Sequence, residues 1–529
     1  MTAYILRVEG VDFDATVDDT HNLSAYRGGS LALLAAPCAV REFLQSRGVL
    51  DSEIFIGASQ GAWIVKVADE SAATMLREET EAFLRAGGDK GPSAVFPHLS
   101  FVVDVATGGD YPALKQAEAH NRARQLRHSN WALPEFVESA KGPNNKLDRM
   151  RPAPPACRVH AKGANDNPVS PSFKTRFEYG RDQRQSFYRE EAGETAAHGL
   201  DFARSFEDIV DEAPRGIVTS LSGKIAVFYA DGNKFGKVRE KANSIEGIQT
   251  FSNYLRERQR NLLVNCLDWL RAGAGGEYWD AYLQFPRSNR KEKIWPLRFE
   301  TLLWGGDELI FVMPAWLGVE FAHEFFAWTK DWAFGGERLT FGAGLVFCHE
   351  KTPIRQARKM AKRLADDGKK TLDGALENAL QIEVFESIAL PEYENGLAHY
   401  REAMFSGADE KMLARWLTLR GEGIAGAFDG VAKLKNGAFP RSQLYGLLRK
   451  AAEQKLFPLV LSDETNGDRT LEQGAKSYFR RMGLDADEGL LNLGVLGNAP
   501  LAYSLAFTAA LWDYVEPLPG ADTPGERTA

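Results

Sequence analysis

Two short stretches decide the fold: Tyr229-Ala230-Asp231-Gly232-Asn233-Lys234-Phe235-Gly236 and Trp304-Gly305-Gly306-Asp307-Glu308. The first ends an apolar run that begins at Lys224, which predicts a buried strand with Asp231 directly after it. The second lies between two apolar runs, which predicts a tight β-hairpin over Phe299–Met313. If the buried strand lies beside this hairpin, the carboxylates of Asp231, Asp307 and Glu308 converge.

Convergence of three carboxylates predicts a cation site. Two unit charges about 4 Å apart interact by roughly 4 kcal/mol at an effective dielectric of about 20, so either one carboxyl binds a proton or metal ions occupy the site. The predicted metal ligands are Asp231, Gly232, Asp307 and Glu308, and their oxygen atoms favour Mg²⁺ or Mn²⁺. Such ions would align a triphosphate and activate a ribose hydroxyl for in-line attack. Asp231, Asp307 and Glu308 are therefore the candidate catalytic residues.

Glycines beside these carboxylates suit a bound nucleotide. Gly232 lets the chain turn close to a ligand, and the N–H groups that follow can cradle phosphate oxygens. Lys369, at the end of a predicted helix that begins at Pro353, could reach a triphosphate, although a solvated lysine is the alternative. The candidate nucleotide-binding residues in this half of the chain are Gly232, Asn233, Phe235, Gly236, Gly305, Gly306 and Lys369.

The first 130 residues show the same order of elements as residues 216–372. The apolar patterns predict β-α-β-β-α-β, a ferredoxin-like unit, with strands Tyr4–Val8, Glu53–Ile56, Ala62–Val67 and Leu99–Val105 and helices Ser30–Gln45 and Ala72–Ala86. The turn Gly57–Gly61 offers no carboxylate, so this unit is expected to bind nucleotide without catalysing.

A phosphate site is expected where the first helix of this unit begins. Arg27-Gly28-Gly29-Ser30 precedes the predicted helix, and helix N-termini attract phosphate. Arg27 and Ser30 are therefore further candidates for nucleotide binding. The alternative is an ordinary helix cap, in which Ser30 bonds its own first turn.

Residues 131–215 are predicted to form an irregular, mildly basic linker, because Pro and Gly are frequent there. Its mixed arginines and aromatic residues could bind nucleic acid by phosphate contact and stacking, or could pack on their own domain. Cys157 and His160 have C-x-x-H spacing, but structural zinc needs four ligands, so no metal is expected there. Helical patterns dominate residues 373–518, and the tail 519–529 is expected to be disordered.

Composition excludes several classes of protein. The 529 residues are 44% hydrophobic, which supports real cores. The net charge of -8 argues against a basic nucleic-acid coat. The four cysteines are scattered, so neither a disulfide framework nor a zinc ribbon is indicated. No signal peptide is expected, because Met1–Arg7 is not a charged region followed by a long apolar core. No membrane span is expected, because the stretch Leu501–Val515 is short and contains polar residues. A cytoplasmic location fits.

The second unit resembles the catalytic palm of the large polymerase-like subunit of type III CRISPR effector complexes, whose wider relatives are the GGDEF nucleotide cyclases. The residues that carry the resemblance are Tyr229 to Asn233, Gly305 to Glu308, and the run from Phe341-Gly342-Ala343-Gly344 through Pro353-Ile354 to Lys369. Residues 1–130 look like that subunit's inactive first palm, with Ala58-Ser59-Gln60 where acidic residues would be. The resemblance implies an α+β fold of two ferredoxin-like palms, the first degenerate and the second catalytic, followed by a helical C-terminal domain.

The chain departs from that family at three points. Glu308 stands where the family commonly has Asp. The nuclease domain, often N-terminal, is expected to be missing, because the first palm begins almost at Met1. The zinc ribbon is reduced to Cys157 and His160. The guanine-recognising Asn-Asp-x-x-Gly-His stretch of GGDEF enzymes is also absent, which favours ATP over GTP. The resemblance implies cyclic oligoadenylate as the product, a second messenger in antiviral defence.

Three hypotheses stay open at this point. The first is an enzyme that joins ATP into cyclic oligonucleotides. The second is a scaffold subunit of an RNA-guided complex that binds nucleotide without turnover. The third is a stand-alone cyclic-dinucleotide synthase. The expected partners are ATP, and either a guide RNA with other effector subunits or an activating nucleic acid.

Overall fold

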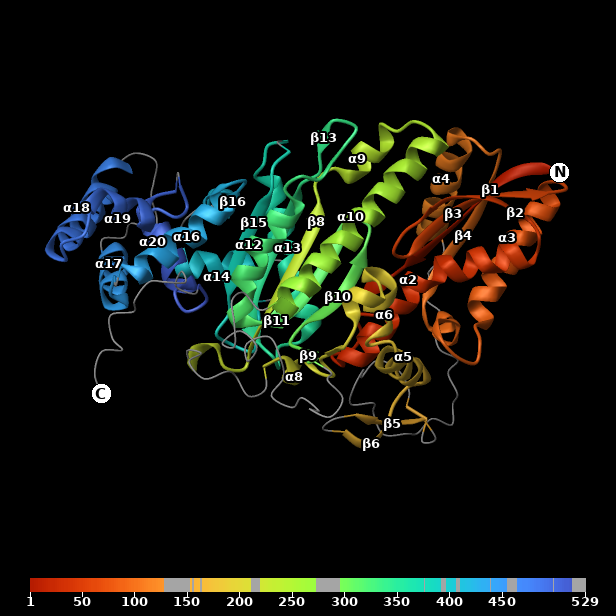
Figure 1. The fold of residues 1–529 in the computed structure, drawn as a ribbon, viewed down its shortest axis with the longest axis horizontal. Coiled ribbons are helices and arrows are strands. Elements are labelled where there is room, and N and C mark those ends of the chain that lie inside the picture. Colours follow the sequence, from red (N-terminus) through yellow and green to blue (C-terminus); the bar gives the residue numbers. More distant parts are fainter. Residues whose placement is uncertain are drawn as a thin grey trace. The chain divides into compact units, whose positions relative to one another are not determined.

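The structure is a computed structural model (Figure 1), and it describes most of the chain: residues 1–127, 153–154, 157–161, 164–210, 219–272, 295–374, 376–391, 396–405, 410–437, 439–453, 464–497 and 499–515. The chain divides into two compact units. The first unit comprises Met1–Asp208, Lys234–Leu309 and Ala333–Glu337, and the second comprises Ile209–Asn233, Ile310–Trp332 and Arg338–Ala529. The predicted tail 519–529 lies outside the described residues.

A four-stranded antiparallel sheet organises the start of the first unit, shown in red and orange in Figure 1. The strand order is β2-β3-β1-β4, with β1 paired to both β3 and β4. The elements in chain order are β1 (Thr2–Val11), α2 (Leu23–Ser46), β2 (Leu50–Ile56), β3 (Gln60–Val67), α3 (Glu70–Ala86), β4 (Ser100–Thr107) and α4 (Tyr111–Arg127). This arrangement confirms the ferredoxin-like fold that was predicted for residues 1–130.

Helix α2 begins earlier than the sequence suggested. Asn22 caps it, accepting a hydrogen bond from the Ala25 N–H, and the helix continues through Gly28 and Gly29. Glycine is a poor helix former, but a Cβ on Gly28 would lie 1.8 Å from the carbonyl oxygen of Arg176 in α5 (Pro171–Asp182). The two glycines therefore serve close helix packing, and the prediction of a helix start at Ser30 was wrong.

Much of the predicted irregular linker is helical. Besides α5, it contains α6 (Ser186–Ala192) and α7 (Glu194–Ala197), together with the short strands β5 (Arg158–Ala161), β6 (Ala164–Pro168) and β7 (Leu200–Phe202). Phe173 and Arg176 are completely buried, and Arg176 pairs with Asp19 at 2.8 Å. At these positions the basic and aromatic side chains pack within the first unit, which favours the second of the two interpretations over nucleic-acid binding.

The second half of the chain repeats the order of the first. Strand β8 (Lys224–Gly232) pairs antiparallel with β14 (Phe341–His349), which pairs parallel with β15 (Ala379–Val384). The sheet has the order β10-β11-β8-β14-β15-β16. Its remaining strands and its helices are β10 (Glu300–Gly305), β11 (Glu308–Pro314), β16 (Leu419–Arg420), α9 (Phe235–Glu240), α10 (Ile245–Ala272), α12 (Gly318–Thr329) and α13 (Ile354–Lys370).

Helices dominate the range 373–518, as predicted, although β15 and β16 in that range belong to the sheet. They are α14 (Gly396–Phe405), α15 (Glu410–Trp416), α16 (Gly423–Asn436), α17 (Arg441–Glu453), α18 (Glu464–Arg481), α19 (Ala486–Leu493) and α20 (Leu501–Leu511). None of the helices in the described ranges is long and apolar enough to cross a membrane.

Candidate active site

The hairpin turn between β10 and β11 carries the predicted acidic pair. Gly305 and Gly306 have φ angles of +155° and +62°, which L side chains rarely adopt, so glycine is required at both positions. Asp307 closes the turn, Glu308 is the first residue of β11, and both are half-buried. The sequence prediction of a tight glycine hairpin is confirmed.

Two side chains from other elements hold this turn. Gln259 of α10 donates from its Nε2 to the carbonyl oxygen of Gly306 at 2.6 Å. Trp304, the residue before the turn, donates from its indole N–H to the carboxylate of Glu191 in α6 at 3.0 Å. Burial raises the pKa of the Glu191 carboxyl, while the hydrogen bond from Trp304 acts in the opposite direction.

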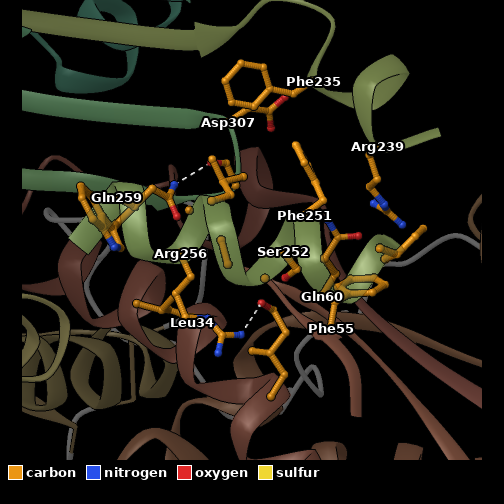
Figure 2. A pocket seen from close by; sticks show the side chains of 18 of the residues that line it. Leu34, Phe55, Gln60, Phe235, Arg239, Phe251, Ser252, Arg256, Gln259 and Asp307 are labelled. Carbon is orange, nitrogen blue, oxygen red and sulfur yellow. Dashed lines mark hydrogen bonds between the residues drawn. The ribbon is translucent and has the colours of Figure 1, made fainter. Parts of the chain in front are cut away.

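A cavity of about 400 Å³ lies in the first unit. It is lined both by the turn between β2 and β3 and by the glycine hairpin between β10 and β11. Figure 2 shows Asp307 and Phe235 at one end, Phe55 and Gln60 at the other, and α10 between them. The full lining is Leu34, Cys38, Arg41, Phe55, Ile56, Gly57, Ala58, Gln60, Glu191, Phe235, Gly236, Arg239, Ile248, Phe251, Ser252, Leu255, Arg256, Gln259, Trp304, Gly305, Gly306 and Asp307. This volume falls within the usual range of small-molecule sites.

The charged residues of the lining are three arginines, Arg41, Arg239 and Arg256, and two acidic residues, Glu191 and Asp307. The guanidinium of Arg239 lies 4.8 Å from the ring centroid of Phe55, a cation–π contact. Arg256 donates to the backbone carbonyl of Ile56 at 3.0 Å. Guanidinium groups bind phosphate oxygens with paired hydrogen bonds, so the cavity suits a phosphorylated ligand that has an apolar part.

In the second unit, Asp231 is held by a lysine. Lys369, near the end of α13, donates from Nζ to the carboxylate of Asp231 and to the carbonyl oxygen of Gly232, the latter at 3.2 Å. The side chain of Lys369 runs close over Gly342 in β14, where a Cβ would lie 2.4 Å from its Cγ. Gly342 therefore allows the lysine to reach Asp231.

Asn233 has a structural role. Its backbone N–H donates to the carbonyl oxygen of Thr340 at 2.7 Å, and its side-chain amide donates to Thr340 Oγ1 at 3.1 Å and to the carbonyl of Glu377 at 2.9 Å. These bonds fix the chain directly after Asp231. The role of Asn233 in nucleotide binding stays a prediction.

Arg27 and Ser30 are not at a helix N-terminus, so the predicted phosphate site there is wrong. Both lie inside α2, and Ser30 is half-buried. Arg27 is 3% exposed, its guanidinium pairs with Glu300, and it donates to the carbonyl oxygens of Gly180 and Ala203. Burial lowers the pKa of Arg27, but its pairing with Glu300 outweighs that effect and keeps it charged.

The convergence of the three carboxylates stays a prediction. Asp307 and Glu308 belong to the first unit and Asp231 to the second. Across the described ranges, no group of three or more His, Cys, Asp or Glu side chains could by itself hold a metal ion.

Sequence reasoning missed several residues that surround the hairpin. Glu191, Arg239, Arg256 and Gln259 come from helices whose partners lie far along the chain. The helical spacing of apolar residues in α10 predicted the helix, but the pattern carries no information about which polar face meets Gly306.

Residues 224–378 match the family model "Cas10/Cmr2, second palm domain". Among solved structures, the chain is similar to a Csm1–Csm4 cassette in complex with cA4, at 13% identity and a TM-score of 0.49 over 97% of this chain and 70% of that chain. It is also similar to Csm1 in T. onnurineus, at 14% identity and a TM-score of 0.47 over 97% of this chain and 69% of that chain. No curated protein matches the sequence.

The family model covers the part of the chain that contains Asp231, the glycine hairpin and Lys369. The strand order β2-β3-β1-β4 supplies the palm-like sheet that precedes it. Residues 224–378 therefore match the second palm domain of the Cas10/Cmr2 family, and a ferredoxin-like sheet of strand order β2-β3-β1-β4 precedes them.

Proposed function

We propose that this protein is a metal-dependent nucleotidyl transferase that joins ATP into cyclic oligoadenylate, a second messenger in antiviral defence. The observation that carries the proposal is the cavity of about 400 Å³, which the glycine hairpin of a Cas10/Cmr2 palm shares with the turn of the first palm. Asp307 lies at this cavity together with three arginines.

The lining of the cavity supports a nucleotide as its occupant. Arg239 and Arg256 supply positive charge for a triphosphate, and Phe235, Phe251 and Phe55 supply apolar surface for a base and ribose. An acceptor ATP would be held against the first palm's turn, with its ribose hydroxyl directed toward Asp307.

The donor set at the catalytic strands fits a hard cation. The ammonium of Lys369 is bound by the carboxylate of Asp231 and the carbonyl oxygen of Gly232, so these two oxygens already gather positive charge. Asp231, Gly232, Asp307 and Glu308 would hold Mg²⁺ or Mn²⁺. When bound, the metal ions would lower the pKa of the attacking hydroxyl and neutralise charge on the phosphates.

The reaction is a displacement at the α-phosphorus of one ATP. The ribose hydroxyl of the second ATP attacks, the α–β phosphoanhydride bond breaks, and pyrophosphate leaves with the electron pair. The hydroxyl proton passes to solvent or to a carboxylate. Lys369 would leave Asp231 for the triphosphate as the site loads.

The test is product analysis with radiolabelled ATP and MgCl₂. We expect the wild-type chain to release pyrophosphate and a cyclic oligoadenylate that mass spectrometry identifies. Asp307→Asn should lower turnover by about 10³-fold or more, about 4 kcal/mol of transition-state stabilisation, while its circular dichroism matches that of wild type. A wild-type rate in Asp307→Asn would remove the site assignment.

The activating partner is tested in the same assay, with and without nuclease treatment of the purified chain and with any nucleic acid recovered from it added back. A guide RNA and further effector subunits are proposed as the activators. ATP binding with no product under either condition would favour the scaffold function, whereas a cyclic dinucleotide formed without nucleic acid would favour a stand-alone synthase.

A further inference from the structure

The turn between β2 and β3 of the first palm lies against the glycine hairpin of the second. Gly305 has no side chain at the point of contact, and a Cβ there would lie 1.8 Å from the Cβ of Ala58 and 2.8 Å from its Cα. The methyl group of Ala58 therefore occupies the space that any side chain at position 305 would need. Both turns belong to the first unit and line one cavity.

The first palm holds this turn rigidly from its own side. The Gly57 N–H donates to the carbonyl oxygen of Gln60 at 2.7 Å, which closes the turn. The Gly10 N–H donates to the carbonyl oxygen of Ser59 at 2.6 Å, which ties the turn to β1. The backbone on both sides of Ala58 is thus fixed by its own sheet, so Ala58 cannot move away from Gly305 without breaking these bonds.

Helix α10 connects the same two turns through side chains one helical turn apart. Arg256 donates to the carbonyl of Ile56 at 3.0 Å, and Gln259 donates to the carbonyl of Gly306 at 2.6 Å. Figure 2 draws both bonds as dashed lines from α10. Residues three apart on a helix lie on one face, so a single face of α10 fixes the spacing between the two turns.

We propose that the β2–β3 turn of the first palm is a positioning element for the catalytic hairpin, and that Ala58 is the size-critical residue that sets where Asp307 stands. This proposal rests on the proposed function for its effect on turnover, but the contact itself does not. A turn without carboxylates thereby acts through Gly305: it supports the reacting geometry instead of contributing ligands to it.

The experiment is a size series at position 58 with two independent readouts. Ala58→Gly removes the contact, and Ala58→Leu pushes on the hairpin. Hydrogen–deuterium exchange of the peptide that spans residues 300–314 reports the order of the hairpin, and kcat and KM for ATP report catalysis. The matched control is Ala82→Leu, an exposed position on α3 of the same palm.

We expect exchange of the hairpin amides about tenfold faster in both position-58 variants. We also expect kcat to fall at least tenfold in Ala58→Leu, with the melting temperature changed little. Ala82→Leu should match wild type in both readouts. If Ala58→Leu fails to fold, Ala58→Gly decides by exchange alone.

Wild-type exchange rates at the hairpin in Ala58→Gly and Ala58→Leu would overturn the proposal. An absence of product from every variant, including wild type, would count against the proposed function, while the exchange data would still decide the positioning role. Faster exchange with unchanged kcat would also overturn it, because the hairpin would then be loosened without catalytic consequence.

Discussion

The two palms place a hairpin turn at the same point of the same β-α-β-β-α-β order, yet only one turn carries acidic side chains. The first palm has Gly57-Ala58-Ser59-Gln60 between β2 and β3, and the second has Gly305-Gly306-Asp307 between β10 and β11. Both line one cavity. The difference teaches that a turn without carboxylates can still contact the hairpin that carries them.

The largest effect that we expect is on the free energy of unfolding, after removal of an ion pair between the two palms. Arg27 on α2 of the first palm and Glu300 on β10 of the second form an ion pair in which each side chain is no more than 3% exposed. Arg27→Met leaves a buried carboxylate without its partner, which should cost about 3–5 kcal/mol of unfolding free energy. Urea denaturation measures it.

The control for that experiment is Arg47→Met, whose side chain is 48% exposed and pairs with Glu79 at 3.1 Å. An exposed pair contributes about 1 kcal/mol or less. The double variant Arg27→Met/Glu300→Gln should recover part of the loss. Equal destabilisation by Arg27→Met and Arg47→Met would mean that the α2–β10 pair does not join the two palms energetically.

A metal-ion titration tests whether the second palm alone binds a cation. Mg²⁺ should raise the melting temperature of wild type, because a ligand that binds only the folded state stabilises it by about 2.7 kcal/mol at one hundred times its Kd. The shift should be smaller in Asp231→Asn and unchanged in Ser59→Ala, a first-palm turn variant. The same shift in Asp231→Asn as in wild type would argue against a metal site at that residue.

Replacing Lys369 should separate metal binding from turnover. In Lys369→Met, Asp231 loses a competing cation, so the Mg²⁺ midpoint of the thermal shift should fall about tenfold while turnover drops. Lys370→Met is the matched control, since Lys370 is 68% exposed and pairs with Asp367 at 2.9 Å. A higher Mg²⁺ midpoint in Lys369→Met would show that the lysine does not compete for Asp231.

The smallest effect concerns Glu191, which supports Trp304 beside the hairpin. A carboxyl whose pKa is raised by folding favours the folded state in acid, and this advantage is lost as pH rises through the raised pKa. Glu191→Gln keeps an acceptor for Trp304 and does not titrate. Its melting temperature should therefore rise relative to that of wild type as the pH increases from 4 to 7. Glu402→Gln, at an exposed position on α14, is the control and should show the same pH dependence of the melting temperature as wild type. The same pH dependence in Glu191→Gln would contradict the assignment.

Local pattern was sufficient for the first sheet, for β8 and for the glycine hairpin, but not for β15, which lies in the range 373–518 that was expected to be helical. The continuous apolar run of β8 predicts a buried strand, and the glycines at 305 and 306 predict a tight turn, in each case from a few neighbouring residues. The start of α2 was not predictable in this way, because Gly28 and Gly29 are explained by Arg176, about 150 residues away. Packing between distant segments overrides local propensity there.

The residues of the candidate site also fall into two groups, those that local sequence indicates and those that matter only through distant neighbours. Asp231, Asp307 and Lys369 could be proposed from the sequence because their residue types and their positions at element ends indicate the chemistry. Glu191, Gln259 and Ala58 were missed because each matters only through a neighbour on another element. Arg27 was misassigned for the same reason, since Glu300 lies 273 residues further along the chain.

Gly342 lets an acidic site be disturbed without any change to its acidic residues. The Lys369 side chain runs through the space that a side chain at position 342 would need. Gly342→Ala should therefore displace the ammonium from Asp231 while every carboxylate and the lysine itself stay in the sequence. Reach across a neighbouring strand, and not only the kind of charged residue, thus decides which groups meet at this strand end.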